Sequence, residues 1–337
     1  MTVYDDCVTI AKLGMTKANS STETRQFAAE QTSRLLRHLA FQMSHTVKSC
    51  TPDSVHDVRV AIRRFTQAIA VFRPCLPGKD MRKIRRRLKD VMKAAGQVRD
   101  CDVALKLLSK SRLPDGAPIQ SKVRNRRKEA ARVLVGELRS WTERQTSIKW
   151  RAALESALAK GDDDFGRPPI EATARKTLRR MTKDFLERGN EAAGSKASAQ
   201  DLHRFRIAAK KFRYSLELFA PLYGASLERG LAHMKTAQTM LGSVNDCEAV
   251  ASLVAQLGAS ANLVARLKKR QRRKTDEFCE YWAAEFHASE QLRSWMDLLR
   301  LRPMRKPVAR AGTVSPKKMP AAKLPARPPA EAASGGA

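Results

Sequence analysis

Two stretches of the chain repeat each other at a fixed spacing, and this repeat constrains the fold more than any other feature. Residues 56–74 align with residues 203–221 at an offset of 147, and of these 19 positions six are identical and five conservative. A shorter pair follows each copy, because Gly96-Gln-Val-Arg-Asp-Cys101 matches Gly242-Ser-Val-Asn-Asp-Cys247 at an offset of 146. One structural unit present twice is the simplest explanation.

Apolar residues recur at helical spacing along most of the chain, and no segment shows the sustained alternation of a half-buried strand. Aromatic residues make up only 6% of the chain, and Val and Ile are too few for an extensive sheet. The sequence therefore predicts an all-α fold. The expected helices are 23–47, 53–73, 80–95, 98–110, 119–145, 171–189, 199–219, 225–241, 244–257 and 260–299.

Two changes of composition divide the sequence. Residues 159–169 contain glycines, three consecutive aspartates and paired prolines, which predicts a linker between a first half, 24–150, and a second half, 170–300. Residues 302–337 are rich in proline, alanine and basic residues, and they bury too little apolar surface to offset the entropy of ordering. We expect a disordered basic tail that binds polyanions diffusely; the alternative is a tail that only keeps the protein soluble.

Several classes of protein are excluded by simple features. No stretch approaches the ~20 consecutive apolar residues of a membrane-spanning helix. The first ten residues, with Asp5 and Asp6, lack the layout of a signal peptide. The six cysteines are scattered and include no C-x-x-C pair. We therefore expect a cytoplasmic protein without a membrane partner, with reduced and mostly buried cysteines.

The charge balance points to the kind of partner. The chain has 65 Lys and Arg against 34 Asp and Glu, a formal net charge of +31, so we expect a polyanion as its partner. In the first copy of the repeat, His56, Arg59 and Arg63 share one side of a helix, opposite Phe65 and Phe72. The second copy repeats this division between a cationic face and an apolar face.

Other predicted helices carry basic residues three and four positions apart with almost no interleaved acids. Like charges at this spacing repel, and a bound anion would relieve the repulsion; the alternative is ordinary solvated helix faces. Scarce aromatic residues argue against single-stranded nucleic acid, whose bases stack on exposed rings. The candidate phosphate-binding residues are His56, Arg59, Arg63, Arg64, Arg82, Arg85, Arg86, Lys89, Lys93, Arg179, Lys183, His203, Arg206, Lys210, Lys211, Arg213, Lys235, Lys269, Arg270 and Arg273.

The repeated histidines and aspartates each have rival interpretations. His56 and His203 could donate to phosphate, whose field would raise their pKa; they could instead cap a helix or bond a neighbouring loop, or ligate a metal. Asp100 and Asp246 follow the repeated glycines, which resemble helix stops, so we expect each carboxylate to cap a new helix or to pair with an arginine.

Motifs of known catalytic chemistry are absent from the sequence. It contains no G-x-x-x-x-G-K-[ST] loop, no H-E-x-x-H and no G-x-S-x-G. It also lacks a cluster of carboxylates that would hold Mg²⁺ for phosphoryl transfer. We therefore expect binding without turnover, and no cofactor or metal. A metal-dependent phosphohydrolase using His56, Asp57 and His203 is the enzymatic alternative.

The paired H-x-x-R-x-A-x-[RK]-[RK]-F segments, each followed by a helix and G-x-V-x-D, resemble the CHAD family, the conserved histidine α-helical domain, over about residues 24–300. The resemblance implies two four-helix bundles related by a pseudo-twofold axis, with basic residues lining a central cavity or groove. It also implies binding of inorganic polyphosphate and localisation to polyphosphate granules. The implied motif residues are the two histidines, the basic residues that follow them, and Asp100 and Asp246.

The two copies also differ from each other. The first has Thr66-Gln67 where the second has Arg213-Tyr214, and the helix before Gly242 is less basic than the one before Gly96. The E-x-E-x-K signature of the CYTH triphosphatase domain, to which many CHAD domains are fused, is absent, so the chain resembles a stand-alone member. A nucleoid-associated protein that binds DNA or RNA backbones through charge alone is the second functional hypothesis.

Overall fold

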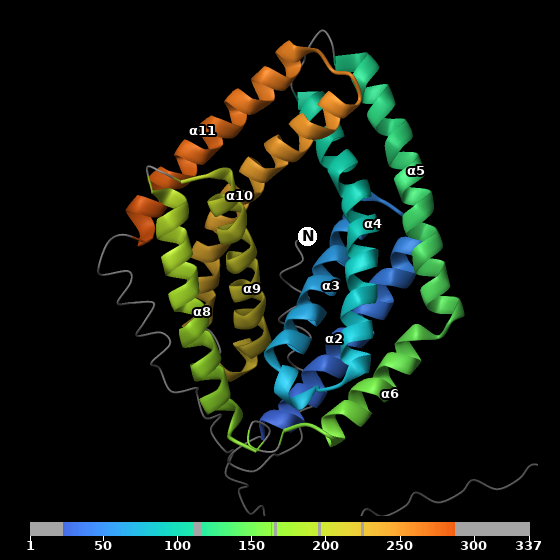
Figure 1. Ribbon diagram of the computed structural model, residues 1–337, viewed down its shortest axis with the longest axis vertical. Helices are drawn as coiled ribbons and strands as arrows, with labels where there is room; N and C mark the ends of the chain where they lie inside the picture. Colours follow the sequence, from blue (N-terminus) through green and yellow to red (C-terminus); the bar gives the residue numbers. More distant parts are fainter. Residues whose placement is uncertain are drawn as a thin grey trace, which may run out of the picture. The chain divides into compact units, whose positions relative to one another are not determined.

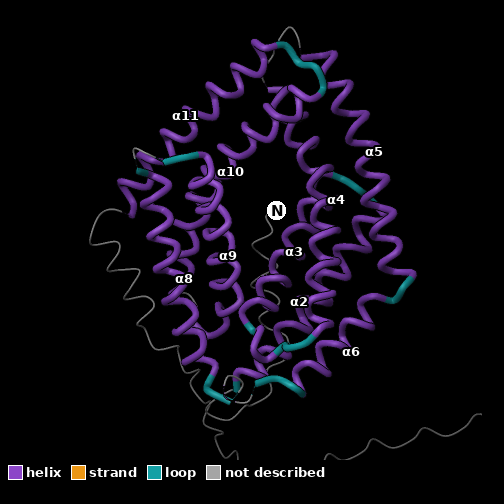
Figure 2. The backbone as a smooth tube through the Cα atoms, viewed as in Figure 1, coloured by secondary structure: helices purple, strands orange, loops and turns teal. Residues whose placement is uncertain are grey.

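The computed structural model describes residues 23–110, 116–162, 164, 167–194, 197–223 and 226–286. Over these residues the protein consists of helices joined by short loops and has no β-strand, which confirms the all-α prediction (Figure 2). The predicted tail, 302–337, and the end of the last predicted helix lie outside the described residues. None of the described helices is long and apolar enough to cross a lipid bilayer.

The helices fall into two successive groups (Figure 1). The first group is followed by a linker, after which the second group begins. The first group consists of α2 (Thr24–Lys48), α3 (Pro52–Val71), the 3-10 turn η1 (Arg73–Cys75), α4 (Lys79–Lys110), α5 (Gly116–Glu143) and α6 (Thr146–Ala159). The second group consists of α8 (Ile170–Ala193), α9 (Ala199–Tyr223), α10 (Ser226–Gln256) and α11 (Ala261–Phe286).

Each group contains a closed four-helix bundle with the same order of contacts. In the first, α2 packs on α3, α3 on α4, α4 on α5, and α5 back on α2; in the second, α8, α9, α10 and α11 repeat this circuit. Between the bundles, α3 contacts α9, α4 contacts α10 and α2 contacts α8. Each of these three contacts joins a helix to its counterpart in the other bundle, as a pseudo-twofold relation requires.

Two expected helix boundaries are wrong, and one helix was not expected. The pairs 80–95 with 98–110, and 225–241 with 244–257, are each one continuous helix, α4 and α10. Glycine costs a helix interior only about 1 kcal/mol, which packing on both sides offsets, so Gly96 and Gly242 end nothing. The expected helix 119–145 corresponds to α5, but no helix was expected over 146–159, where α6 follows a turn at Gln145 with φ 50°.

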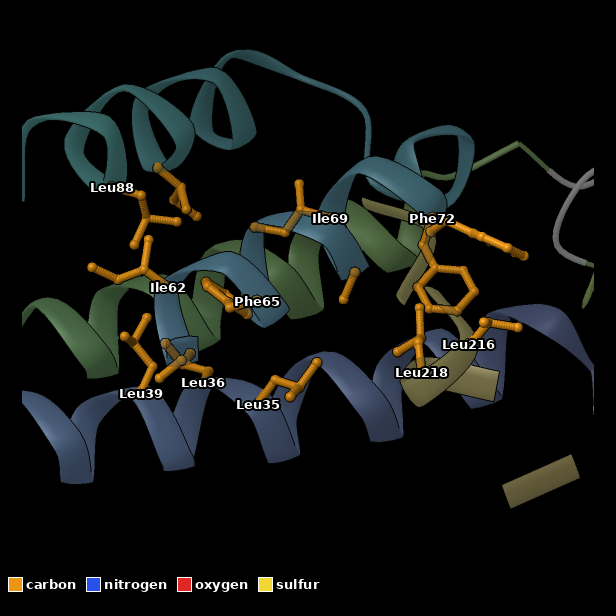
Figure 3. Packing of buried hydrophobic residues seen from close by; sticks show 14 of the residues in the cluster. Leu35, Leu36, Leu39, Ile62, Phe65, Ile69, Phe72, Leu88, Leu216 and Leu218 are labelled. Carbon is orange, nitrogen blue, oxygen red and sulfur yellow. The ribbon is translucent and has the colours of Figure 1, made fainter. Parts of the chain in front are cut away.

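Two apolar clusters hold the bundles together. The larger one spans both bundles, and there the ring of Phe27 lies 6.1 Å from that of Phe72 and 6.2 Å from that of Phe219. Figure 3 shows Phe65 and Ile69 of α3, and Phe72 directly after it, directed into this cluster among leucines of α2 and α9. The smaller cluster joins α4 and α10 again further along, from Cys101 on the first and Val250 on the second.

The linker is packed against the first bundle. The hydroxyl and the amide of Thr24 both donate to the Pro168 carbonyl, at 2.8 and 3.2 Å. A Cβ at Gly161 would lie 2.6 Å from the Cys75 carbonyl oxygen, so only glycine allows this close approach. Of the described cysteines, Cys75, Cys101 and Cys247 are buried and Cys50 and Cys279 half-buried, and all five are free thiols.

Candidate anion-binding site

The repeated helices divide their faces as predicted. Phe65 on α3 and Phe72 directly after it are fully buried, whereas His56 is exposed and Arg59 and Arg63 are half-buried. The helix begins where Thr51 accepts a hydrogen bond from the Ser54 amide at 3.2 Å. On α9 the same division places Phe205, Phe212 and Phe219 in the core and leaves the cations on the other side. The amphipathic pattern therefore correctly predicted which side of each helix enters the core.

Charged residues from both bundles meet where α3, α4, α9 and α10 come together. Their charges affect one another's pKa between the two bundles. The charge of Arg206 lowers the pKa of Arg59 and of Asp100, and the charge of Arg99 lowers the pKa of Asp246. This site lies along α4 between the larger and the smaller apolar clusters. We call it the central cluster; its members are Arg59, Arg63, Arg99, Asp100, Arg206, Lys210 and Asp246.

Arg59 is held by a contact with α4 that depends on a glycine. Its Nη1 donates to the Met92 carbonyl oxygen at 3.2 Å, and a Cβ on Gly96 would lie 3.1 Å from that same nitrogen. The glycine of the repeated motif is therefore a seat for a guanidinium group rather than a helix stop. Burial lowers the pKa of Arg59 to about 10, and Arg63 adds to the lowering while Asp100 opposes it.

Two further cations of the central cluster are also strained electrostatically. Burial, followed by the charges of Arg63, Arg206 and Arg59, lowers the pKa of Lys210 to about 6, so this amine is mostly neutral at pH 7. Burial and the charge of Arg63 also lower the pKa of Arg206, and its Nε is buried without a hydrogen-bond partner. Both groups would be stabilised by added negative charge.

Asp100 and Asp246 supply the only negative charge in the central cluster. Burial raises the pKa of both carboxyl groups, and the nearby arginines partly oppose this shift. Neither residue caps a helix, because each lies in the interior of α4 or α10; the capping prediction was wrong, since it assumed helix ends at the glycines. The alternative was pairing with an arginine: the charges of nearby arginines lower the pKa of both carboxyl groups, but neither forms an ion pair within the described residues.

The two histidines lie at the edge of the central cluster. Burial and then the charge of Arg99 lower the pKa of His56, although its side chain stays accessible to solvent, as expected for a recessed surface. His203 borders a pocket of about 20 Å³ together with Arg206, Asn245 and Gln271, which has room for one water molecule. Neither histidine bonds a cap or a loop, and the described residues contain no group of three potential metal ligands.

Two candidate arginines are engaged where α3 crosses α9. Arg64 and Arg213 both donate to Glu217, at 2.8 and 2.9 Å, and Arg213 also donates to Gln238 at 3.0 Å. Nearby, Gln67 donates to the Ser215 hydroxyl at 2.9 Å. The first copy has no equivalent of Glu217, because Ala70 stands there. These contacts hold the crossing of the two helices, and we call them the crossing clasp.

The remaining candidates lie in several places. An exposed row of basic side chains follows α4, and none of them has an ion-pair partner within the described chain. Lys183 on α8 lies 3.7 Å from Glu187, and Arg273 on α11 lies 3.6 Å from Glu277. The charge of Arg179 on α8 opposes the rise in the pKa of Tyr223 that burial causes. Lys211, Lys235 and Lys269 are exposed, and Arg270 is half-buried beside Cys247. The row on α4, the α4 stripe, consists of Arg82, Arg85, Arg86, Lys89 and Lys93.

One cation of the central cluster, Arg99, is not among the predicted phosphate-binding residues. The charge of Arg99 lowers the pKa of His56, Arg59, Asp100 and Asp246. It thus affects more groups of the site than most of the predicted cations do. The signal was available, because Arg99 belongs to the repeated Gly-x-Val-x-Asp motif. It was overlooked because the second copy has Asn245 at that position.

Comparison with known proteins places this arrangement in a family. The family model of the CHAD domain matches residues 28–255, and the chain belongs to the CHAD family. The structure is similar to the crystal structure of the CHAD domain from the plant Ricinus communis, at a TM-score of 0.62 and 20% identity, over 86% of this chain and 96% of that one.

A second solved structure, PptA from Streptomyces chartreusis, is similar at a TM-score of 0.57 and 13% identity, over 82% of this chain and 100% of that one. At these identities the likeness concerns the fold. No curated protein matches the sequence.

Proposed function

We propose that this CHAD protein binds inorganic polyphosphate, without chemical turnover, at its central cluster. The observation that carries the proposal is the electrostatic strain among the clustered cations. Burial and mutual repulsion lower the pKa of Arg59, Arg206 and Lys210, and only two carboxylates stand against these cations. A chain of phosphates supplies closely spaced negative charge and restores the favoured charged state of each cation.

The chemistry of the residues suits a repetitive phosphate chain. Arg59 and Arg206 present planar forks that bind two phosphate oxygens at once, and Lys210 supplies a compact charge between them. The exposed α4 stripe continues from the central cluster along the same helix and extends the cationic surface. Binding should weaken steeply with salt, because neutralised phosphates release condensed counterions. Association with polyphosphate granules would follow from such binding.

Binding of DNA or RNA backbones is the competing function, and the α4 stripe favours it because its exposed cations would accept any phosphate backbone. The central cluster argues against it as the main role. Its cations are half-buried at the junction of two bundles, and its neighbours on the helices offer no exposed aromatic ring for base stacking. A narrow, base-free chain is the better fit.

A titration with long-chain polyphosphate, repeated with duplex DNA, tests the proposal. Arg59→Gln combined with Lys210→Gln should lower polyphosphate affinity at least ten-fold while retaining helicity. The matched control is Lys149→Gln with Arg151→Gln, which removes two exposed charges from α6. Equal losses in both variants, or equal affinity of the wild-type protein for DNA at rising salt, would contradict a dedicated polyphosphate site.

A further inference from the structure

Lys210 differs in chemistry from the other cations of the central cluster. Those four are arginines, namely Arg59, Arg63, Arg99 and Arg206. A guanidinium keeps its charge at neutral pH, whereas an amine gives up its proton readily when it is buried or crowded by like charges. Lys210 is therefore the cation of this cluster that relieves the mutual repulsion by losing its charge.

The fold places Lys210 close to three of these arginines. Arg206 stands one turn before it on α9, where the Cβ atoms of residues four apart lie ~5–6 Å from each other. Arg59 and Arg63 stand one turn apart on α3, which packs against α9. At the offset of 147, the counterpart of Lys210 is Arg63, so the first copy of the repeat has a permanent cation where the second has an amine.

The amine of Lys210 is available as a nucleophile at neutral pH. Burial and the charges of the three arginines lower its pKa to about 6, so most of it is unprotonated at pH 7. A lysine with the ordinary pKa near 10.4 is less than ~0.1% unprotonated at that pH. Neighbouring cations activate a lysine in this way, because only the unprotonated amine has a lone pair for attack. The side chain is half-buried, so a small solute reaches it.

The arginines around this amine select the kind of electrophile. Their planar forks bind pairs of phosphate oxygens, and Nε of Arg206 has no hydrogen-bond partner within the described residues. They would hold an electrophile whose reactive carbon is joined to a phosphate group through one oxygen, with that carbon beside the amine. An acyl phosphate has this structure. Its carbonyl carbon is uncharged, unlike the phosphorus atoms of a phosphate chain, whose anionic oxygens repel a lone pair.

We propose that Lys210 is a modification site, acylated by small acyl phosphates that bind at the central cluster. The unprotonated Nζ attacks the acyl carbon, a C–N bond forms, and the C–O bond to the phosphate group breaks. The phosphate leaves with the electron pair of that bond and takes the proton that the amine loses. The products are an amide on Lys210 and inorganic hydrogen phosphate. The nearby guanidinium groups stabilise the negative charge that develops on the leaving oxygen.

Acylation would also change how the central cluster binds its ligand. An amide nitrogen takes up no proton at neutral pH, so a modified Lys210 cannot regain the charge that a phosphate chain would restore. This consequence rests on the proposed function, whereas the acylation itself does not. We expect acetylation of Lys210 to weaken polyphosphate binding at least three-fold, because the cluster loses one cation.

Incubation of the full-length protein with acetyl phosphate at pH 7 tests the proposal, with acetylation followed by peptide mass spectrometry. Lys210 should react at least ten-fold faster than Lys211, its exposed neighbour on the same helix, which lacks the surrounding arginines. Inorganic phosphate should slow the reaction at Lys210 and not at Lys211, because it competes for the arginines. Equal rates at the two lysines, or no competition by phosphate, would overturn the proposal.

A pair of arginine variants tests the role of the guanidinium groups. Arg206→Gln leaves the amine in place but removes one phosphate-binding group, so it should slow acetylation of Lys210 at least five-fold. The matched control, Arg151→Gln, removes an exposed charge from α6 and should leave the rate unchanged. Circular dichroism checks that both variants keep their helicity. Equal rates in the two variants would contradict selection of the electrophile by the arginines.

Lys210→Arg separates a failure of this proposal from a failure of the proposed function. Acetyl phosphate should lower the polyphosphate affinity of the wild-type protein and not that of Lys210→Arg, each compared with its own untreated sample. If the untreated wild-type protein does not bind polyphosphate, the proposed function fails, and preferential acetylation of Lys210 still supports the modification site. If polyphosphate binds but Lys210 is not acetylated, the modification site fails and the proposed function stands.

Discussion

Replacing Gly96 with alanine separates helix stability from ligand binding in a way that few substitutions permit. Alanine is about 1 kcal/mol more favourable than glycine within a helix, so the change by itself stabilises α4. The new Cβ, however, would stand 3.1 Å from Nη1 of Arg59, tighter than ordinary contact, and the guanidinium must move away. It then loses its hydrogen bond to the Met92 carbonyl oxygen.

The expected magnitudes follow from these two effects. Loss of a hydrogen bond from a charged donor costs about 1 kcal/mol. This cost cancels the gain in helix propensity, so the free energy of unfolding should stay nearly constant. Displacing Arg59 from its seat should weaken polyphosphate binding by about 1 kcal/mol, roughly five-fold in Kd.

The pseudo-twofold relation provides a matched control. Gly242 occupies the equivalent place in α10, but a Cβ there would meet nothing within 4 Å. Gly242→Ala should therefore gain about 1 kcal/mol of stability and leave binding unchanged. Urea unfolding and calorimetric titration of both variants measure the contrast. Identical behaviour of the two substitutions would refute the view that Gly96 seats Arg59.

Four further predictions concern the charges of the central cluster and of the crossing clasp. The pKa of Lys210 is near 10.4 in the unfolded chain and about 6 in the folded protein. Lys210 therefore lowers the stability of the free protein increasingly as the pH falls from about 10 to 6, because the unfolded chain takes up the proton first. Unfolding curves should show that Lys210→Met stabilises the protein at pH 7 and not at pH 11. Polyphosphate binding at pH 8 should take up a proton at Lys210, detected as a buffer-dependent binding enthalpy that the same variant loses. Asp100→Asn with Asp246→Asn should raise polyphosphate affinity several-fold, because two opposing charges disappear; weaker binding in a titration would mean that the carboxylates assist the ligand. Glu217→Gln should destabilise the protein by about 1–2 kcal/mol in urea unfolding, since two half-buried arginines lose their shared counter-charge; an unchanged midpoint would deny the crossing clasp a structural role.

The helix pattern of the sequence predicted the fold class and the division of each repeated helix into a core face and a cationic face. It was wrong at Gly96 and Gly242, where it predicted helix ends, and it missed α6, which begins after Gln145. Local propensity treats glycine as a stop, but packing on both sides of α4 and α10 carries the helix through it. Conversely, Gln145 adopts a left-handed turn that no local signal announces.

Only the tertiary structure distinguishes between cations that share the same sequence pattern. Arg59 and Arg213 lie on equally basic helix faces, yet the first joins the central cluster and the second pairs with Glu217 in the crossing clasp.

The sequence by itself determined that the protein is helical, duplicated and strongly cationic, because periodicity, repetition and net charge are properties of the chain alone. The tertiary structure decided which charges gather, because proximity between α3, α4, α9 and α10 depends on how two bundles pack against each other. The strain of the central cluster arises only there, where burial and repulsion act on the same few side chains.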